Sequence, residues 1–70
     1  MCEANAYIYD QESGEERLFL ESVDRLTPVN DSLLLENIFG EKKYIAATIK
    51  ELRLVEHRII LLAKGVEAAV

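Results

Sequence analysis

The segment EANAYIY, residues 3–9, decides the fold class because its side chains alternate in character with a period of two. Successive side chains of an extended strand point to opposite faces. One face of this segment would carry Ala4, Ala6 and Ile8, and the other Asn5, Tyr7 and Tyr9. The polar stretch DQESGE follows at residues 10–15, and its Gly14 can adopt a positive φ. A strand that leads into such a loop predicts a β-hairpin.

Short apolar runs separated by turn signals continue beyond this hairpin. The runs lie at residues 17–21, 23–28, 33–38 and 43–49 and contain good strand formers. Pro28 indicates the edge of a sheet or the end of a strand. Turn residues fill positions 29–32 and 39–42, the second turn around Gly40. Strands spaced about ten residues apart are typical of a small barrel or sandwich.

Residues 44–66 fit two different structures. Ile45, Leu52, Val55 and Ile59 recur at near-heptad spacing and would form the apolar stripe of a helix. In contrast, the unbroken run RIILL at residues 58–62 is typical of a buried strand, and no good N-cap residue opens the helix. The pattern slightly favours strands and leaves the helix open. We expect a domain over residues 1–62 and a C-terminal tail over residues 63–70, either a short helix or frayed.

The composition indicates a small folded protein that needs help with its stability. The chain has 70 residues, half of them hydrophobic, which is enough for one domain with a marginal core. Chains of this size are often stabilised by metals, disulfides or oligomerisation. A single cysteine excludes a disulfide within the chain, so we expect a homodimer. We also expect a soluble, cytoplasmic protein, because the sequence shows no signal peptide and no apolar run of the ~20 residues that a membrane span requires.

The sequence lacks the ingredients of the common catalytic and nucleic-acid sites. It contains one His, no second Cys and no glycine-rich phosphate loop, so we expect no enzyme. A formal net charge of −5 argues against binding to a phosphate backbone. We expect the aromatic residues to pack in the core rather than stack on bases, since no basic residues interleave with the tyrosines at positions 7 and 9; these aromatics are Tyr7, Tyr9, Phe39 and Tyr44.

Cys2 is the main candidate for chemistry because of its place beside the N-terminus. Removal of Met1 would give Cys2 a free α-amine next to its thiol, and the two groups can close a five-membered chelate ring on a metal. Nitrogen and thiolate ligands suit Ni(II), Cu and Zn. The alternative for Cys2 is a small buried hydrophobic residue. His57 could be a second ligand or a helper at a dimer axis, or an ordinary surface histidine.

Four segments together resemble the CooT family, small nickel-binding proteins associated with maturation of nickel-dependent carbon monoxide dehydrogenase. They are MCEANAY at residues 1–7, VDRL at 23–26, NIFGEK at 37–42 and HRIIL at 57–61. The similarity extends from residue 1 to about residue 62. Its most specific element is the opening Met1-Cys2, followed by the strand with Asp24-Arg25 and by the Phe-Gly-Glu turn.

The resemblance implies an all-β, Sm-like small barrel of about five or six short strands that forms a homodimer. It also implies a Ni(II) site at the dimer interface, built around Cys2, and a role as a nickel-binding accessory protein whose partner is carbon monoxide dehydrogenase or its nickel-insertion machinery. The resemblance gives His57 no role. The alternative function is an RNA-binding or protein-interaction module without a metal.

Overall fold

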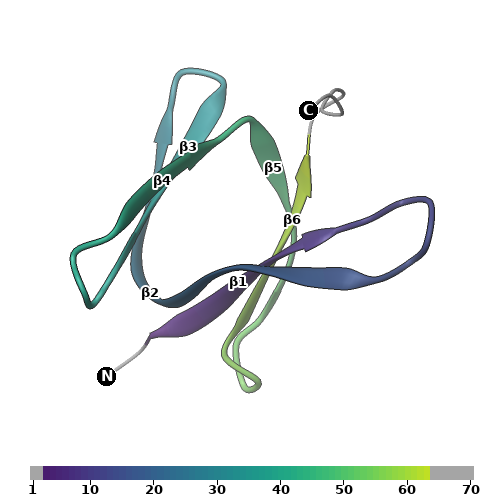
Figure 1. The fold of residues 1–70 in the computed structure, drawn as a ribbon, viewed down its shortest axis with the longest axis horizontal. Coiled ribbons are helices and arrows are strands. Elements are labelled where there is room, and N and C mark those ends of the chain that lie inside the picture. Colours follow the sequence, from purple (N-terminus) through teal and green to yellow (C-terminus); the bar gives the residue numbers. More distant parts are fainter. Residues whose placement is uncertain (1–2, 64–70) are drawn as a thin grey trace.

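The computed structural model describes residues 3–63, which form six β-strands in one sheet (Figure 1). The strands are β1 (Ala4–Tyr9), β2 (Glu16–Val29), β3 (Ser32–Asn37), β4 (Lys42–Ile45), β5 (Ala47–Arg53) and β6 (Arg58–Ala63). Their order across the sheet is β4-β3-β2-β1-β6-β5. β1 and β6 are parallel, and the other neighbours are antiparallel. The all-β prediction is confirmed, and strands rather than a helix follow residue 44.

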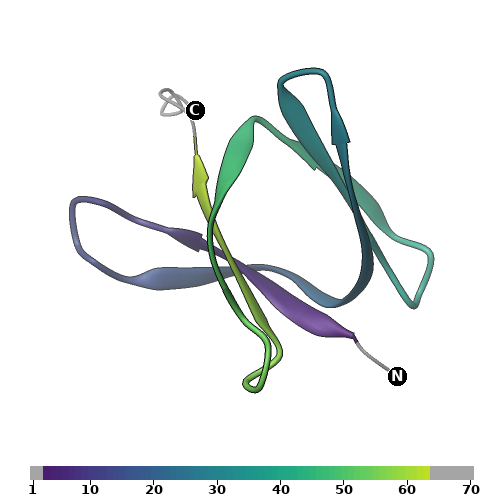
Figure 2. The same ribbon diagram turned by 180° about the vertical axis from the view of Figure 1, so that it is seen from behind.

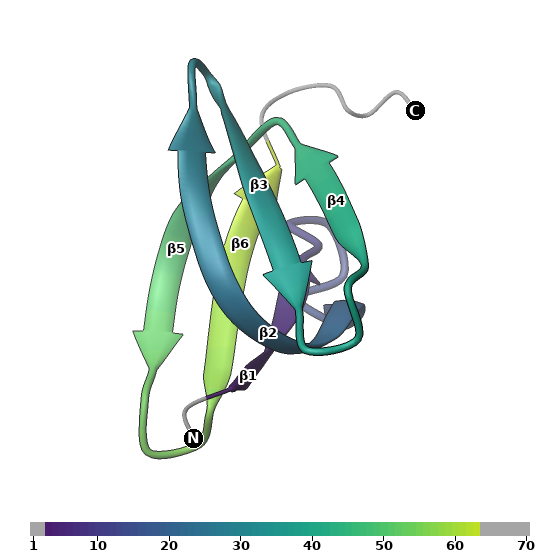
Figure 3. The same ribbon diagram turned by 90° about the vertical axis from the view of Figure 1, so that its left-hand side faces the viewer.

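The sheet is strongly curled because of how its two edge strands are connected. β4 and β5 lie at opposite edges, yet only Ala46 separates them in the sequence. The edges must therefore meet at this residue, and Figures 2 and 3 show the resulting curl from behind and from the side. β3 and β5 are also in contact.

The predicted Sm-like barrel is not confirmed, because the curled sheet does not close. Across residues 3–63, each strand pairs only with its neighbours in the sheet order, and no ladder joins β5 to β2, β3 or β4. β2 and β5 do not pair with one another, and apolar side chains of both strands line a groove. A sheet with unpaired edges can still accept further contacts there.

β2 is a single strand of 14 residues, although the sequence predicts two short runs there. Its first half pairs with β1 and its second half with β3. The two halves meet at Ser22, which has a φ of 55°, and the pairing register shifts around this point. Pro28 lies in the half that pairs with β3 alone, near the end of the strand, as predicted. A missing N–H is tolerated at such an edge.

The predicted turns are confirmed. Gly14 and Gly40 have φ values of 78° and 86° in the β1–β2 and β3–β4 turns. In the first of these turns the Gly14 N–H donates to the Asp10 carbonyl (2.7 Å). The backbone N–H of Glu12 donates to Oδ1 of Asp10 (2.9 Å), and this bond lowers the pKa of the Asp10 carboxyl. The backbone and the side chain of Asp10 together hold the polar loop.

The core lies inside the curl of the sheet. Its buried cluster takes side chains from every strand except β4, with Phe19, Leu26, Ile45 and Ile59 packed against it: Ala6, Leu20, Val23, Leu33, Leu35, Ala47 and Leu61. β6 lies between β1 and β5, and both Ile60 and Leu61 are completely buried. Burial of adjacent residues requires cover on both faces of a strand, which explains the unbroken apolar run at residues 58–62.

The predicted strand over residues 43–49 is divided at Ala46 into β4 and β5. At the other end of this half, β6 continues to Ala63, the first residue of the expected tail. The remainder of that tail, residues 64–70, lies outside the described residues, so the domain division at residue 62 stays a prediction. Within the part that the structure describes, no helix is long and apolar enough to span a membrane.

Candidate functional site

Cys2, the predicted metal ligand, lies outside the described residues. β1 begins at Ala4, two residues later. The end of the sheet where β1 begins is therefore the candidate site.

A row of hydrogen bonds connects two strands and two turns at this end of the sheet. The Asn5 N–H donates to the His57 carbonyl (2.9 Å), and the Ser22 N–H donates to Oδ1 of Asn5 (3.0 Å). The Ile38 N–H in turn donates to the Ser22 carbonyl (3.0 Å). Asn5 thus joins the start of β1 to the β5–β6 turn and to the bulge in β2. These bonds give the residues after Cys2 a fixed support.

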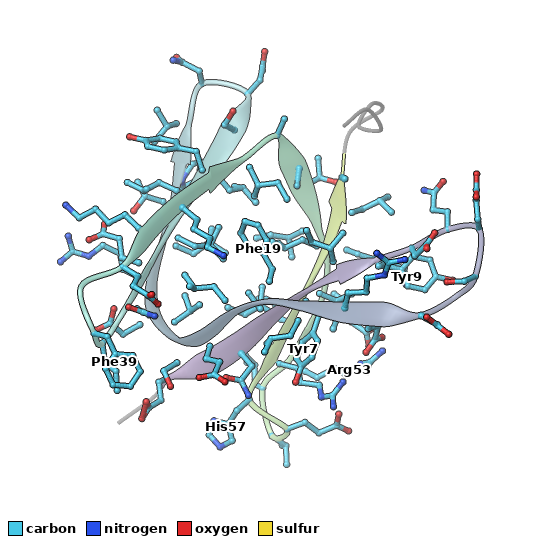
Figure 4. All side chains as sticks on the ribbon, in the orientation of Figure 1. Tyr7, Tyr9, Phe19, Phe39, Arg53 and His57 are labelled. Carbon is cyan, nitrogen blue, oxygen red and sulfur yellow. The ribbon has the colours of Figure 1, made fainter. Side chains whose placement is uncertain are left out.

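His57 lies in the β5–β6 turn beside the start of β1 (Figure 4). Asn5 pairs with Arg58 in the parallel ladder, so the register puts residue 57 opposite Ala4. The His57 N–H donates to the Leu54 carbonyl (3.1 Å), and the residue has a φ of 58° with an exposed side chain. A non-glycine residue with positive φ is uncommon, although His is enriched there. The structure brings His57 to the candidate end without assigning it a role.

Asn37 organises the β3–β4 turn at the same end of the sheet. Its side chain is 5% exposed, and its Oδ1 accepts from the N–H groups of Phe39 (3.0 Å) and Glu41 (2.9 Å). Its Nδ2 donates to Oε1 of Glu41 (2.7 Å). Its backbone also pairs with Glu41 (N to O, 3.0 Å) and accepts from Gly40 (3.1 Å). The role of Asn37 was not predicted from the sequence. The signal that could have indicated it is an Asn three residues before a turn glycine.

An apolar groove opens between β2 and β5, beside the start of β1. It has a volume of about 360 Å³, and its walls are formed by Ala4 of β1, residues 23–26 of β2, Ile49 and Leu52 of β5, Leu54 of the next turn and Ile59 of β6. Of these, only Asp24 and Arg25 are charged. No local sequence pattern predicts the groove, because its walls come from four strands and a turn that only the fold brings together.

The aromatic residues divide into two groups, and the prediction that all four pack in the core is wrong for Phe39 and Tyr44. Both of these side chains are exposed. Tyr7 and Tyr9 are half-buried, and each carries a cation over its ring: Arg58 over Tyr7 at 4.4 Å and Lys50 over Tyr9 at 4.6 Å from the centroids. These rings are therefore already covered on one face by the protein's own cations.

Glu16 is the centre of an ion-pair network that joins β2 to β5 and β6. Its carboxylate accepts from Arg53 (2.9 and 3.4 Å) and from Arg58 (3.0 Å). Arg53 also donates to Glu51 (3.2 Å), which lowers the pKa of the Glu51 carboxyl and, with Glu16, raises the pKa of Arg53. The network connects three strands of the sheet.

The comparisons with known proteins decide the family. Residues 1–62 match the family model described as CO dehydrogenase accessory protein CooT. The chain belongs to the CooT family. The structure is similar to the crystal structure of a protein assigned as CooT from Carboxydothermus hydrogenoformans, with a TM-score of 0.84 and 53% sequence identity over 91% of this chain and 100% of the other. No curated protein matches the chain.

CooT is a family of accessory proteins rather than of catalysts. Three of the four segments through which the sequence resembles CooT, at residues 1–7, 37–42 and 57–61, contribute to the hydrogen-bonded end of the sheet, through Asn5, Ile38 and His57. The fourth, at residues 23–26, lines the adjacent groove. Among residues 3–63, no three His, Cys, Asp or Glu side chains gather into a metal site. The family segments therefore contribute to one end of the sheet, the end where β1 begins.

Proposed function

We propose that this protein holds Ni(II) through Cys2 at the interface of a homodimer and supplies it for maturation of carbon monoxide dehydrogenase in the cytoplasm. The observation that carries the proposal is the match to the CooT accessory family, which begins at residue 1 and so includes Cys2. The partner is carbon monoxide dehydrogenase or its nickel-insertion machinery. Ni(II) is cargo in this proposal.

The chemistry of Cys2 suits this cargo. Once Met1 is removed, the thiol and the α-amine of Cys2 form a chelate, and both lose their protons readily when a metal competes for them. A nitrogen–sulfur ligand set favours Ni(II) or Cu(II). In a two-fold dimer each ligand is present twice, so one cysteine per chain can supply a four-coordinate site.

The hydrogen bonds that hold the start of β1 support this proposal. The start of β1 is held from both sides through Asn5. The Asn5 N–H donates to the His57 carbonyl, and the Asn5 side chain accepts from the Ser22 N–H. A ligand on a short segment that precedes such an anchor loses less conformational entropy when it binds a metal. Ala4, two residues after Cys2 in the sequence, lines the apolar groove.

The test is a titration of the reduced protein with Ni(II), followed by calorimetry and near-UV absorption, beside Cys2→Ser. We expect saturable binding with thiolate-to-metal charge-transfer bands in the wild type and loss of tight binding in the variant. The fold should be unchanged, since residue 2 precedes β1. Equal affinity in both proteins would refute the assignment of Cys2.

His57→Asn is the matched control, because Asn tolerates the positive φ at this position and lacks the imidazole. Unchanged nickel affinity in this variant would limit the ligands to those of Cys2 and its backbone. Intact mass spectrometry of the same preparation determines whether Met1 is removed, which decides between the α-amine and a backbone amide as the nitrogen ligand.

A further inference from the structure

β4 leaves one backbone edge of the sheet unpaired. It is the first strand in the sheet order and forms a ladder with β3 alone, so the backbone groups on its other side point away from the sheet (Figure 3). Across residues 3–63, no other strand pairs with this edge. A free edge can accept a further strand through backbone hydrogen bonds. The side chains along β4 determine which strand it accepts.

Exposed aromatic and aliphatic side chains lie along β4 and in the turn before it. Tyr44 of β4 is 65% exposed and Phe39 of the turn is 69% exposed, and Ile38 is exposed as well. A short edge strand with lysines is a usual protection against unwanted pairing, but such protection requires no exposed aromatic ring. Exposed apolar patches mark contacts with other proteins, and aromatic residues are enriched in those contacts. The β4 edge therefore combines free backbone groups with side chains that suit a protein partner.

The turn that carries Ile38 and Phe39 is held in place by hydrogen bonds. The Ile38 N–H donates to the Ser22 carbonyl (3.0 Å), and the Phe39 N–H donates to Oδ1 of the buried Asn37 (3.0 Å). The apolar side chains of the turn are thus presented from a fixed backbone. A contact made from a fixed backbone costs less conformational entropy when a partner binds.

β4 is positively charged, although the whole chain has a net charge of −5. Lys42 and Lys43 are adjacent and exposed, and Lys43 donates to the Phe19 carbonyl (3.1 Å), which leaves its charge unbalanced. Among residues 3–63, Lys42 and Arg25 are the two basic residues without an ion pair, hydrogen bond or cation–π contact. Both lie next to Glu36 in the register, one on each side, so Glu36 offsets one charge of the two. These cations are available to the carboxylates of another protein.

We infer that β4 is the docking edge for an acidic, extended segment of carbon monoxide dehydrogenase, which adds to the sheet as a further strand. This inference rests on the proposed function for the identity of the partner and specifies the surface of contact. Tyr44 shares its face of the sheet with Leu34 opposite, so an apolar residue of the added strand would pack beside them. Carboxylates of the added strand would meet Lys42 and Lys43. A second copy of this chain fits the edge poorly, because two β4 strands side by side would bring their lysines together.

The test is the binding of nickel-free carbon monoxide dehydrogenase to the metal-free protein, measured by biolayer interferometry for the wild type, Lys42→Glu and Tyr44→Thr. Both side chains are exposed, and Thr retains a high strand propensity, so the fold should be kept; far-UV circular dichroism checks it. Lys50→Glu is the matched control, because it makes the same change of charge at an exposed lysine of β5, the opposite edge strand. Amide hydrogen exchange of β4 in the complex is the second measurement, since an added strand protects the amides of the edge it pairs with.

We expect the dissociation constants of Lys42→Glu and Tyr44→Thr to rise at least about tenfold, and that of Lys50→Glu to stay within about twofold of the wild-type value. The amides of β4 should exchange more slowly in the complex.

Wild-type affinity in both β4 variants, an equal loss of affinity in Lys50→Glu, or β4 amides that gain no protection would each overturn the docking edge. A wild type that does not bind the enzyme would overturn it together with the proposed partner. The nickel titration with Cys2→Ser is performed without the enzyme, so a failure of the docking edge and a failure of the nickel site are told apart.

Discussion

Replacement of Asn37 by alanine should destabilise the protein by about 3 kcal/mol, because one buried side chain makes three hydrogen bonds. Its Oδ1 accepts from the N–H groups of Phe39 and Glu41, and its Nδ2 donates to Glu41 at 2.7 Å. Each bond contributes roughly 1 kcal/mol net, and the contribution is larger where a buried group loses its partner. Phe39 and Glu41 are exposed, so water can solvate the released N–H groups. The contribution of roughly 1 kcal/mol per bond therefore applies.

This loss is large relative to the total stability of a domain of this size, roughly 4–10 kcal/mol at 0.05–0.15 kcal/mol per residue. At ~4–8 °C per kcal/mol, the melting temperature should fall by roughly 12–24 °C. The assay is thermal unfolding by circular dichroism at one fixed protein concentration, because association alters the apparent stability. Amide hydrogen exchange should accelerate at Phe39 and Glu41 in particular.

Glu41→Gln is the control for this prediction. Gln keeps an oxygen that can accept from Nδ2 of Asn37 and removes only the charge, so it should cost less than ~1 kcal/mol. If the free energy of unfolding of Asn37→Ala lay within about 1 kcal/mol of the wild-type value, the hydrogen bonds of Asn37 would not hold the β3–β4 turn. That result would refute the reasoning.

Two further predictions concern the β5–β6 turn and the ion pairs. His57→Val should cost about 1–2 kcal/mol of unfolding free energy in urea, because a β-branched side chain is strained at a φ of 58°, whereas His57→Gly should cost less than ~0.5 kcal/mol; equal losses would show that the backbone relaxes. Glu16→Gln should lose about 1 kcal/mol at low salt and less at high salt, because the arginines that Glu16 binds are partly exposed and screened. Glu12→Gln, in the exposed first loop, is the control and should show neither the loss of stability nor the salt dependence. A salt-independent loss of stability for Glu16→Gln would indicate that Glu16 acts through packing instead.

The comparison of sequence and structure is clearest at three places. The period of two at residues 3–9 and the turn glycines predicted β1 and two of the turns correctly, because these signals are local. The length of β2 was not predicted, because the strand continues through the bulge at Ser22 only with the side chain of Asn5 as support, 17 residues away in the sequence. The helix alternative for residues 44–66 was resolved by the burial of both faces of β6, which no local pattern reports.

For the candidate site too, some properties follow from the sequence and others from the tertiary structure. The sequence alone determined the chemistry: one cysteine beside the N-terminus, a single histidine, an acidic balance and the family segments, since ligand type and charge are properties of residues. Only the tertiary structure decided that the start of β1 lies beside His57, the bulge at Ser22 and the apolar groove. These neighbours are far apart in the chain, and the curl that joins them arises because β4 and β5 must meet at Ala46 from opposite edges of one sheet. Proximity of this kind depends on strand order, which local sequence patterns do not specify.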